Sequence, residues 1–184
     1  MDTETMLYAV ARGNRKAFET LYRQQQPIMI RYATGLLAGD LAAAEDAVDE
    51  AFTAIWTQAG RFNGNGNANG WMRRIVRNKA IDWLRKQREC CSVDAELADF
   101  ADQRADPAPS PYDCAEQTSD GNQLRRALIG LSFEHREAVW LCYFEDKSID
   151  EIAEIADCPQ NTVKTRLFYA RKSLKAELLP LLVN

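Results

Sequence analysis

The sequence has few of the residues that build metal or disulfide chemistry. Its 184 residues include one histidine, His135, and five cysteines that form no C-x-x-C pair. A structural zinc site needs four ligands at compatible spacing, so we expect no metal site. The odd number of cysteines favours free thiols in a reducing compartment over a disulfide framework.

Long apolar runs are missing as well. No stretch approaches the roughly 20 apolar residues that a membrane-spanning helix needs, and the acidic, polar residues 1–5 do not resemble a signal peptide. We therefore expect a cytoplasmic protein without membrane insertion. The sequence also lacks a nucleotide-binding Gly loop and a histidine cluster with paired metal carboxylates, which argues against a nucleic-acid-processing enzyme, a cofactor and a small-molecule substrate.

Charge is present, and it is distributed in blocks although the net charge is only −4. Residues 61–88 hold eight Lys or Arg and one acidic residue, whereas residues 89–120 hold nine acidic residues and one Arg. Residues 159–184 hold five basic residues and one acidic residue. Because local fields decide what a surface attracts, the two basic blocks remain compatible with nucleic-acid binding despite the negative total.

Helical periodicity runs through most of the chain, and no segment has a convincing β-strand pattern. Before the acidic segment we expect two helices within residues 5–38 (a break at Gly13, with Pro27 opening the second), one from Asp40 to about Gly60 and one from Trp71 to about Arg88. After it we expect a short helix ending near Gly130, one capped by Ser132 and a final helical pair. The predicted fold class is all-α, with helical domains at residues 1–89 and 122–184 joined by a flexible acidic, Pro-containing linker at residues 90–121.

The final pair, between Ser148 and Leu178, has the pattern of a helix-turn-helix. Ser148 and Glu151 have capping-box spacing. Pro159 interrupts the first helix because it lacks an N–H and disfavours helical geometry in the preceding residue. The second helix combines an apolar stripe with a basic outer face, as a recognition helix in the major groove does. An ordinary helical hairpin with a solvated basic face has the same pattern, so this segment alone does not decide between the two.

Two blocks of the sequence resemble a known family. Residues 46–52 (DAVDEAF), the Gly- and Asn-rich loop after Phe62 and residues 71–82 (WMRRIVRNKAID) resemble region 2 of bacterial extracytoplasmic-function (ECF) sigma factors. Residues 162–167 (TVKTRL), with Ala170 and Arg171, resemble their region 4. The resemblance covers nearly the whole chain in the same order. It implies an alternative sigma factor, without a catalytic site, that binds RNA polymerase core and directs it to specific promoters in a stress or signal response.

The resemblance also implies partners and site residues. The partners are the β and β′ subunits of RNA polymerase core, promoter DNA and a controlling anti-sigma factor. The core-polymerase contacts are Glu45, Asp46, Asp49, Glu50 and Phe52. The minus-ten DNA contacts are Phe62, Asn63, Asn65, Asn67, Trp71, Arg73, Arg74, Arg77, Asn78 and Arg85. The minus-thirty-five DNA contacts are Asn161, Thr162, Lys164, Thr165, Arg166, Phe168, Tyr169, Arg171 and Lys172.

Several of these assignments have alternatives. The acidic helix face is otherwise a solvated face, and Asp49 stands where the family usually has Gln. The loop at residues 62–70 either closes around a flipped base or is a simple connector. Spacing favours core packing over base stacking for Trp71. Asn161 stands where Gly is common and is a candidate helix cap, and Tyr169 stands where a basic residue is usual. A stand-alone helix-turn-helix regulator, which binds duplex DNA without polymerase, is the main rival function.

Overall fold

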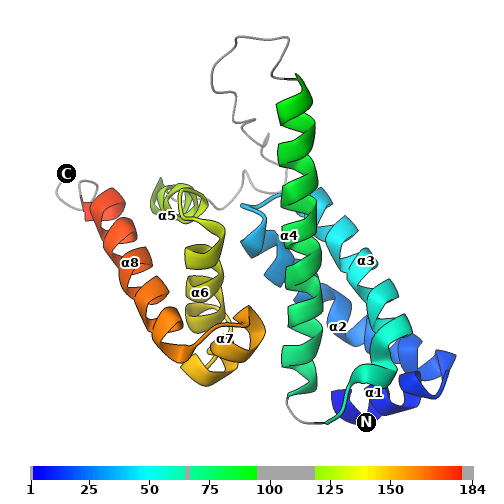
Figure 1. Cartoon of the computed structure of the whole chain (residues 1–184). Helices are drawn as coiled ribbons and strands as arrows, with labels where there is room; N and C mark the ends of the chain where they lie inside the picture. The colour runs from blue at the N-terminus through cyan, green and yellow to red at the C-terminus, as the bar shows by residue number, and fades with distance from the viewer. Residues whose placement is uncertain (1, 65–66, 95–118, 180–184) are drawn as a thin grey trace.

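The computed structural model describes residues 2–64, 67–94 and 119–179, and these residues form helices without any strand (Figure 1). The elements are α1 (Thr3–Ala11), α2 (Arg15–Leu36), α3 (Leu41–Gln58), the short 3-10 helix η1 (Ala59–Arg61), α4 (Ala68–Asp94), α5 (Ser119–Ile129), α6 (Phe133–Tyr143), α7 (Ile149–Ala156) and α8 (Gln160–Leu178). The all-α prediction is confirmed. None of the helices in the described ranges combines the length and apolar character that a bilayer span requires.

Short polar side chains fix where the first helices begin. The Asn14 side chain accepts a hydrogen bond from the N–H of Ala17 at 3.1 Å, and Asp40 does the same for Ala43 at 3.0 Å. Each satisfies a backbone donor that has no partner inside its own helix. The predicted break before α2 and the predicted cap of α3 are therefore confirmed.

One predicted helix start is wrong. Pro27 does not open a helix but lies inside α2, which Asn14 has already started. A proline within a helix leaves one carbonyl, here that of Arg23, without its usual donor. Both residues lie on the exposed side of α2, where water is available to that carbonyl.

Helices extend further into the predicted linker than expected. Helix α4 passes Arg88 and continues to Asp94, because no Gly or Pro interrupts the intervening residues. Helix α5 begins at Ser119. The remaining linker residues, 95–118, lie outside the described residues, so the proposed domain boundaries stay predictions.

The N-terminal helices α1 to α4 share one core. Helix α3 presents a stripe of small residues, including Ala44, Ala47 and Ala51, that is buried against its neighbours α2 and α4. Val48 and Ile55 on the same helix are fully buried. Small side chains let the helix axes approach closely, while the larger ones interdigitate. This packing holds α3 and α4, which carry the predicted site residues, in a fixed relation.

The C-terminal helices form a second unit built around α8. Val163, Leu167 and Ala170 along α8 are buried, as is Ile152 of α7. The capping box of Ser148 and Glu151 is present at the start of α7. The helix-turn-helix is therefore confirmed as local structure.

The two units touch along one side. Helix α6 packs against α2, and α7 packs against α4 (Figure 1). The Trp140 side chain of α6 lies over the backbone of Gly35 in α2, and a guanidinium nitrogen of Arg136 donates to the carbonyl of Leu36 at 3.0 Å. This interdomain contact covers part of the predicted promoter-binding surface.

Candidate nucleic-acid interface

The acidic face of α3 is exposed as the sequence predicts. Glu45, Asp46, Asp49 and Glu50 all point to solvent at helical spacing. Asp49 accepts a hydrogen bond from the Tyr22 hydroxyl at 3.1 Å. Such a cluster of carboxylates on a rigid helix suits a basic partner surface.

Two further members of the predicted polymerase-contacting set, Glu50 and Phe52, also have partners within the chain. The Lys79 ammonium donates to Glu50 at 3.1 Å and lowers the pKa of that carboxyl. Phe52 is 2% exposed, and its ring packs edge-on against those of Phe18 and Tyr22. In this arrangement Phe52 therefore supports α3 from within the core and is not an exposed anchor.

The predicted base-binding loop is anchored at Phe62. This residue is buried, and its ring centroid lies 5.7 Å from that of Tyr8 on one side and 5.7 Å from that of Trp71 on the other. Asn63 and Asn67 are exposed, while Asn65 lies outside the described residues. Aromatic packing thus fixes the start of the loop and leaves two amide side chains accessible. The packing of Trp71 against the core agrees with the preferred alternative.

The arginines of α4 do not lie together in solvent. Each of three predicted minus-ten contacts forms an ion pair with a carboxylate of the C-terminal unit. These interdomain ion pairs are Arg73 Nε with Glu145 Oε2 at 2.6 Å, Arg74 Nη2 with Asp157 Oδ2 at 2.7 Å, and Arg77 Nε with Glu137 Oε1 at 2.7 Å. Asn78 and Arg85, further along α4, are exposed. Arg73 and Arg77 are therefore covered, whereas Arg74, whose side chain is 46% exposed, stays accessible together with Asn78 and Arg85.

Glu137 is the most enclosed charged group in this contact. Its side chain is 0% exposed and accepts hydrogen bonds from Arg77 and from the Tyr32 hydroxyl, the latter at 3.2 Å. Burial raises the pKa of the Glu137 carboxyl, and the Arg77 guanidinium offsets that rise only in part. The pKa of Tyr32 is also raised well above its usual value, chiefly by burial.

The outer face of α8 is open. Most of the predicted minus-thirty-five residues are exposed at helical spacing: Asn161, Lys164, Thr165, Phe168, Tyr169, Arg171 and Lys172. Phe168 and Tyr169 are 57% and 51% exposed, and their ring centroids lie 5.4 Å apart, so together they form an exposed apolar patch of the kind that marks a contact surface. The combination of cations, a hydroxyl and aromatic rings fits contact with phosphates and base edges.

Three of the predicted residues of α8 differ from the rest, and one of them, Thr162, is half-buried. Arg166 is half-buried, and its guanidinium lies 3.5 Å from the sulfur of Cys158 on the inner side of the helix. Asn161 does not cap α8, because the N-cap is Pro159, which offers no side-chain hydrogen bond. The Asn161 side chain therefore remains available on the outer face.

The sequence predictions missed Tyr8 and the three carboxylates that meet the arginines. A signal for Glu137 was present, because it lies on the same helical face as Phe133, Trp140 and Phe144. A carboxylate within an apolar face marks a buried charge that needs a partner. The partner itself, on another domain, is not encoded in local spacing.

Comparison with known proteins identifies both units. The family described as Sigma-70 region 2 matches residues 21–90, and the one described as Sigma-70, region 4 matches residues 121–174. The ECF RNA polymerase sigma factor SigL of Mycobacterium tuberculosis is 31% identical over 159 residues, which is 86% of each chain. The probable RNA polymerase sigma factor RfaY of Xanthomonas campestris is 33% identical over 141 residues, covering 76% of this chain and 35% of RfaY.

Solved structures agree. The sigma factor RpoE of Bartonella quintana, in its complex with the anti-sigma factor NepR, superposes with a TM-score of 0.68 at 26% identity, over 89% of this chain and 97% of that one. An all-helical protein with a region 2 unit and a region 4 helix-turn-helix is a bacterial transcription initiation factor of the sigma class. This chain belongs to the ECF family of RNA polymerase sigma factors.

Proposed function

We propose that the acidic face of α3 docks on the RNA polymerase core, that the loop after Phe62 and helix α4 bind the minus-ten element, and that α8 reads the minus-thirty-five element. The observation that carries this proposal is the separation of an exposed acidic face and an exposed basic recognition helix onto two different units. A chain that only bound DNA would have no evident use for the acidic face of α3.

The chemistry of the minus-ten step needs no catalytic group. Unstacked bases are captured by loop amides such as Asn63 and Asn67, and phosphates are held by the cations of α4. The chain therefore acts by binding alone, in the cytoplasm, where its polymerase and promoters are. An anti-sigma factor is a further proposed partner, supported by the relative of known structure that was solved with one.

The rival function, a stand-alone helix-turn-helix regulator, is separated from this proposal by the requirement for polymerase. Mapping of transcript 5′ ends after overexpression gives a promoter fragment. A gel shift on that fragment then compares the chain alone, the core alone and both together. We expect a promoter-specific shift only with both. An equally tight, specific shift by the chain alone would favour the rival.

A further inference from the structure

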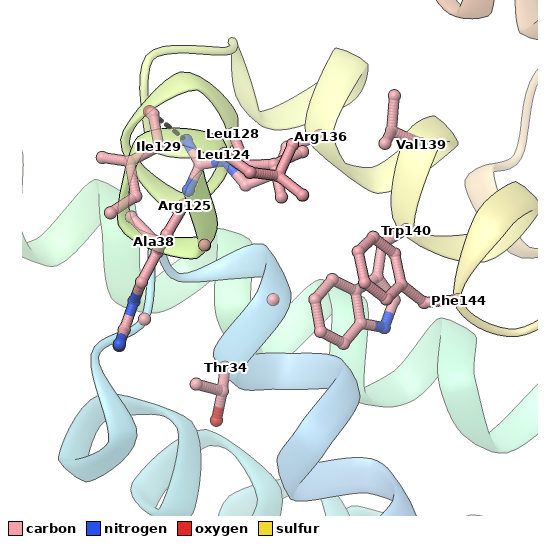
Figure 2. Close-up of a pocket in the computed structure, with 13 residues that line it drawn as sticks. Thr34, Ala38, Leu124, Arg125, Leu128, Ile129, Arg136, Val139, Trp140 and Phe144 are labelled. Carbon is pink, nitrogen blue, oxygen red and sulfur yellow. Dashed lines mark hydrogen bonds between the residues drawn. The ribbon is translucent and has the colours of Figure 1, made fainter. Parts of the chain in front are cut away.

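Exposed aromatic side chains gather at three places among the described residues. Phe168 and Tyr169 lie on the proposed recognition helix α8. Tyr143 and Phe144 lie at the end of α6, where Phe144 borders a cavity between α2, α5 and α6 (Figure 2). The fifth is Tyr8 of α1, which is 41% exposed and is the one exposed aromatic residue in the described part of the N-terminal unit. No predicted contact accounts for its exposure.

Tyr8 lies against the start of the predicted base-binding loop. Helix α1 packs on η1, which leads into that loop (Figure 1). A Cβ atom at Gly64 would fall on the Tyr8 hydroxyl oxygen, so this hydroxyl reaches the backbone of the loop. Gly64 has a φ of 71°, which also favours glycine there. The Tyr8 hydroxyl donates to Oε1 of Glu4, one turn earlier in α1, at 3.3 Å, and this bond helps to hold the ring beside the loop.

Phe62, the aromatic residue of the loop that the sequence assigns to the minus-ten contact, has no accessible ring face. It is 7% exposed, and the rings of Tyr8 and Trp71 lie on either side of it, each with its centroid 5.7 Å away. Stacking on a base requires an accessible face of the ring. Tyr8 covers one side of Phe62 and keeps part of its own ring in solvent. The accessible aromatic surface beside the loop therefore belongs to Tyr8.

We propose that Tyr8 is a minus-ten contact of this chain, and that its exposed ring face stacks on an unpaired base of the melted promoter. This inference rests on the proposed minus-ten role of the loop after Phe62. The amides of Asn63 and Asn67 are exposed on the same loop. An aromatic ring stacks on any base because every base has a π-face, whereas amides discriminate between base edges. Tyr8 thus supplies affinity for the captured base, and α1 becomes part of the DNA-binding surface.

Three variants separate stacking from structural support. Tyr8→Leu removes the aromatic face but keeps an apolar side chain against Phe62, and leucine is a good helix former. Tyr8→Phe keeps the ring and loses only the hydrogen bond to Glu4. Phe144→Leu is the matched control, because it removes an aromatic side chain that is 48% exposed on the C-terminal unit. Circular dichroism and affinity for core polymerase verify that each variant folds and docks.

The experiment couples the side chain to individual bases. Each chain is assembled with core polymerase, and fluorescence anisotropy measures the affinity for the promoter fragment mapped by transcript 5′ ends. The minus-ten element of this fragment is mismatched, so that melting contributes nothing to the measured affinity. A set of further fragments carries an abasic nucleotide at each unpaired position in turn. Removing the side chain and the base separately and together measures the interaction between them.

We expect Tyr8→Leu to bind the intact mismatched fragment about tenfold more weakly than the wild type, as the loss of one stacked base predicts. At one position, the abasic nucleotide weakens wild-type binding by a similar factor, and Tyr8→Leu then adds no further loss. Tyr8→Phe restores most of the affinity, because the ring supplies the stacking. The Phe144→Leu chain responds to the abasic nucleotides as the wild type does at every position.

Two results would overturn the inference. An equal loss for Tyr8→Leu on the intact and on every abasic fragment would show that Tyr8 only supports the fold. Unchanged affinity of Tyr8→Leu for the intact fragment would show that it contacts no base.

The proposed function is judged separately. The Asn63→Ala and Asn67→Ala chains are compared on the intact fragment and on one with a scrambled minus-ten element. If Tyr8 fails its test and these chains discriminate less than the wild type between the two fragments, the loop keeps its minus-ten role without Tyr8. Unchanged discrimination would overturn the role of the loop and, with it, the inference.

Discussion

Arg77 on α4 donates from Nε to Oε1 of Glu137 on α6 at 2.7 Å, which joins a cation of the region 2 unit to a carboxylate of the region 4 unit. The pair is enclosed, with Glu137 fully buried. Removing the Arg77 side chain would leave the buried Glu137 carboxylate uncompensated, which typically costs about 3–5 kcal/mol unless the carboxyl takes up a proton. The contact between the two units therefore depends in part on the charge state of the Glu137 carboxyl group.

The first prediction concerns pH. In the closed form the two units are in contact and Glu137 is buried, whereas in an open form the units are apart and this carboxyl is solvated. The raised pKa of Glu137 means that the closed form binds a proton more readily than the open form. Closure is thus penalised above the raised pKa and favoured as pH falls through it. Arg77, Tyr32 and Arg166 are the charged or titratable groups that act on this carboxyl, and all three oppose the rise in its pKa.

Scattering measured from about pH 8 to pH 5 is expected to show a smaller average radius of gyration at the lower pH. Glu137→Gln carries a permanently neutral amide, so its radius of gyration is expected to stay constant over this range. A wild-type chain that expands on acidification, while remaining helical, would contradict the assigned direction.

The second prediction concerns the recognition helix. Lys164→Ala and Phe168→Ala each remove a side chain from the outer face of α8, where Phe168 is 57% exposed. With core polymerase present, we expect each to weaken use of a promoter with a cognate upstream element, by about 1–3 kcal/mol for a base-contacting side chain. Affinity for core polymerase itself, measured by fluorescence polarisation, should not change. An equal loss in core affinity would contradict the minus-thirty-five role proposed for α8.

The third prediction concerns the proposed polymerase-docking face. Asp46→Lys reverses an exposed charge at the centre of the acidic face of α3. Charges of this kind steer encounter, so we expect a slower association with core polymerase, by about tenfold at low salt and less at high salt. Glu134→Lys makes the same change in charge on α6 and serves as control. Equal slowing in both variants would show a net-charge effect in place of a docking face.

The fourth prediction concerns the stability of the helix-turn-helix. The Ser148 hydroxyl accepts from the N–H of Glu151, and the Glu151 carboxylate accepts from the N–H of Ser148 at 3.0 Å. Ser148→Ala removes the first bond and is expected to lower the free energy of unfolding of the region 4 unit by about 0.5–2 kcal/mol. Urea unfolding measures this change in the free energy of unfolding when it is followed by the fluorescence of Trp140, the single tryptophan of that unit. Ser148→Thr keeps the hydroxyl and should lose much less.

Local features were predictable from the sequence because they depend on neighbours in the chain. The caps at Asp40 and Ser148, the turn before Pro159 and the exposed faces of α3 and α8 follow from short-range spacing. Pro27 was misplaced because an exposed helix interior tolerates a proline that the helix-start preference would place at an end. The preference of proline for the first turn of a helix is a tendency, and the helix start set by the Asn14 cap outweighs it.

Long-range relations were not predictable in the same way. Arg73 and Arg77 have the composition and spacing of a DNA-binding surface, yet in the closed arrangement they are covered by another unit. Their partners lie 72 and 60 residues further along the chain. Periodicity indicates which face of a helix is charged, but it does not indicate which distant helix meets that face. Tyr8, which packs on Phe62 from α1, was missed for the same reason.

The most direct test of the account is transcription reconstituted from purified core polymerase, this chain and a promoter fragment mapped by transcript 5′ ends. We predict initiation at one discrete site that requires both the chain and the core, and that is lost when either promoter element is scrambled. Initiation by the core alone at the same site, or no specific transcript from the two together, would contradict the central claim that this chain gives polymerase its promoter specificity.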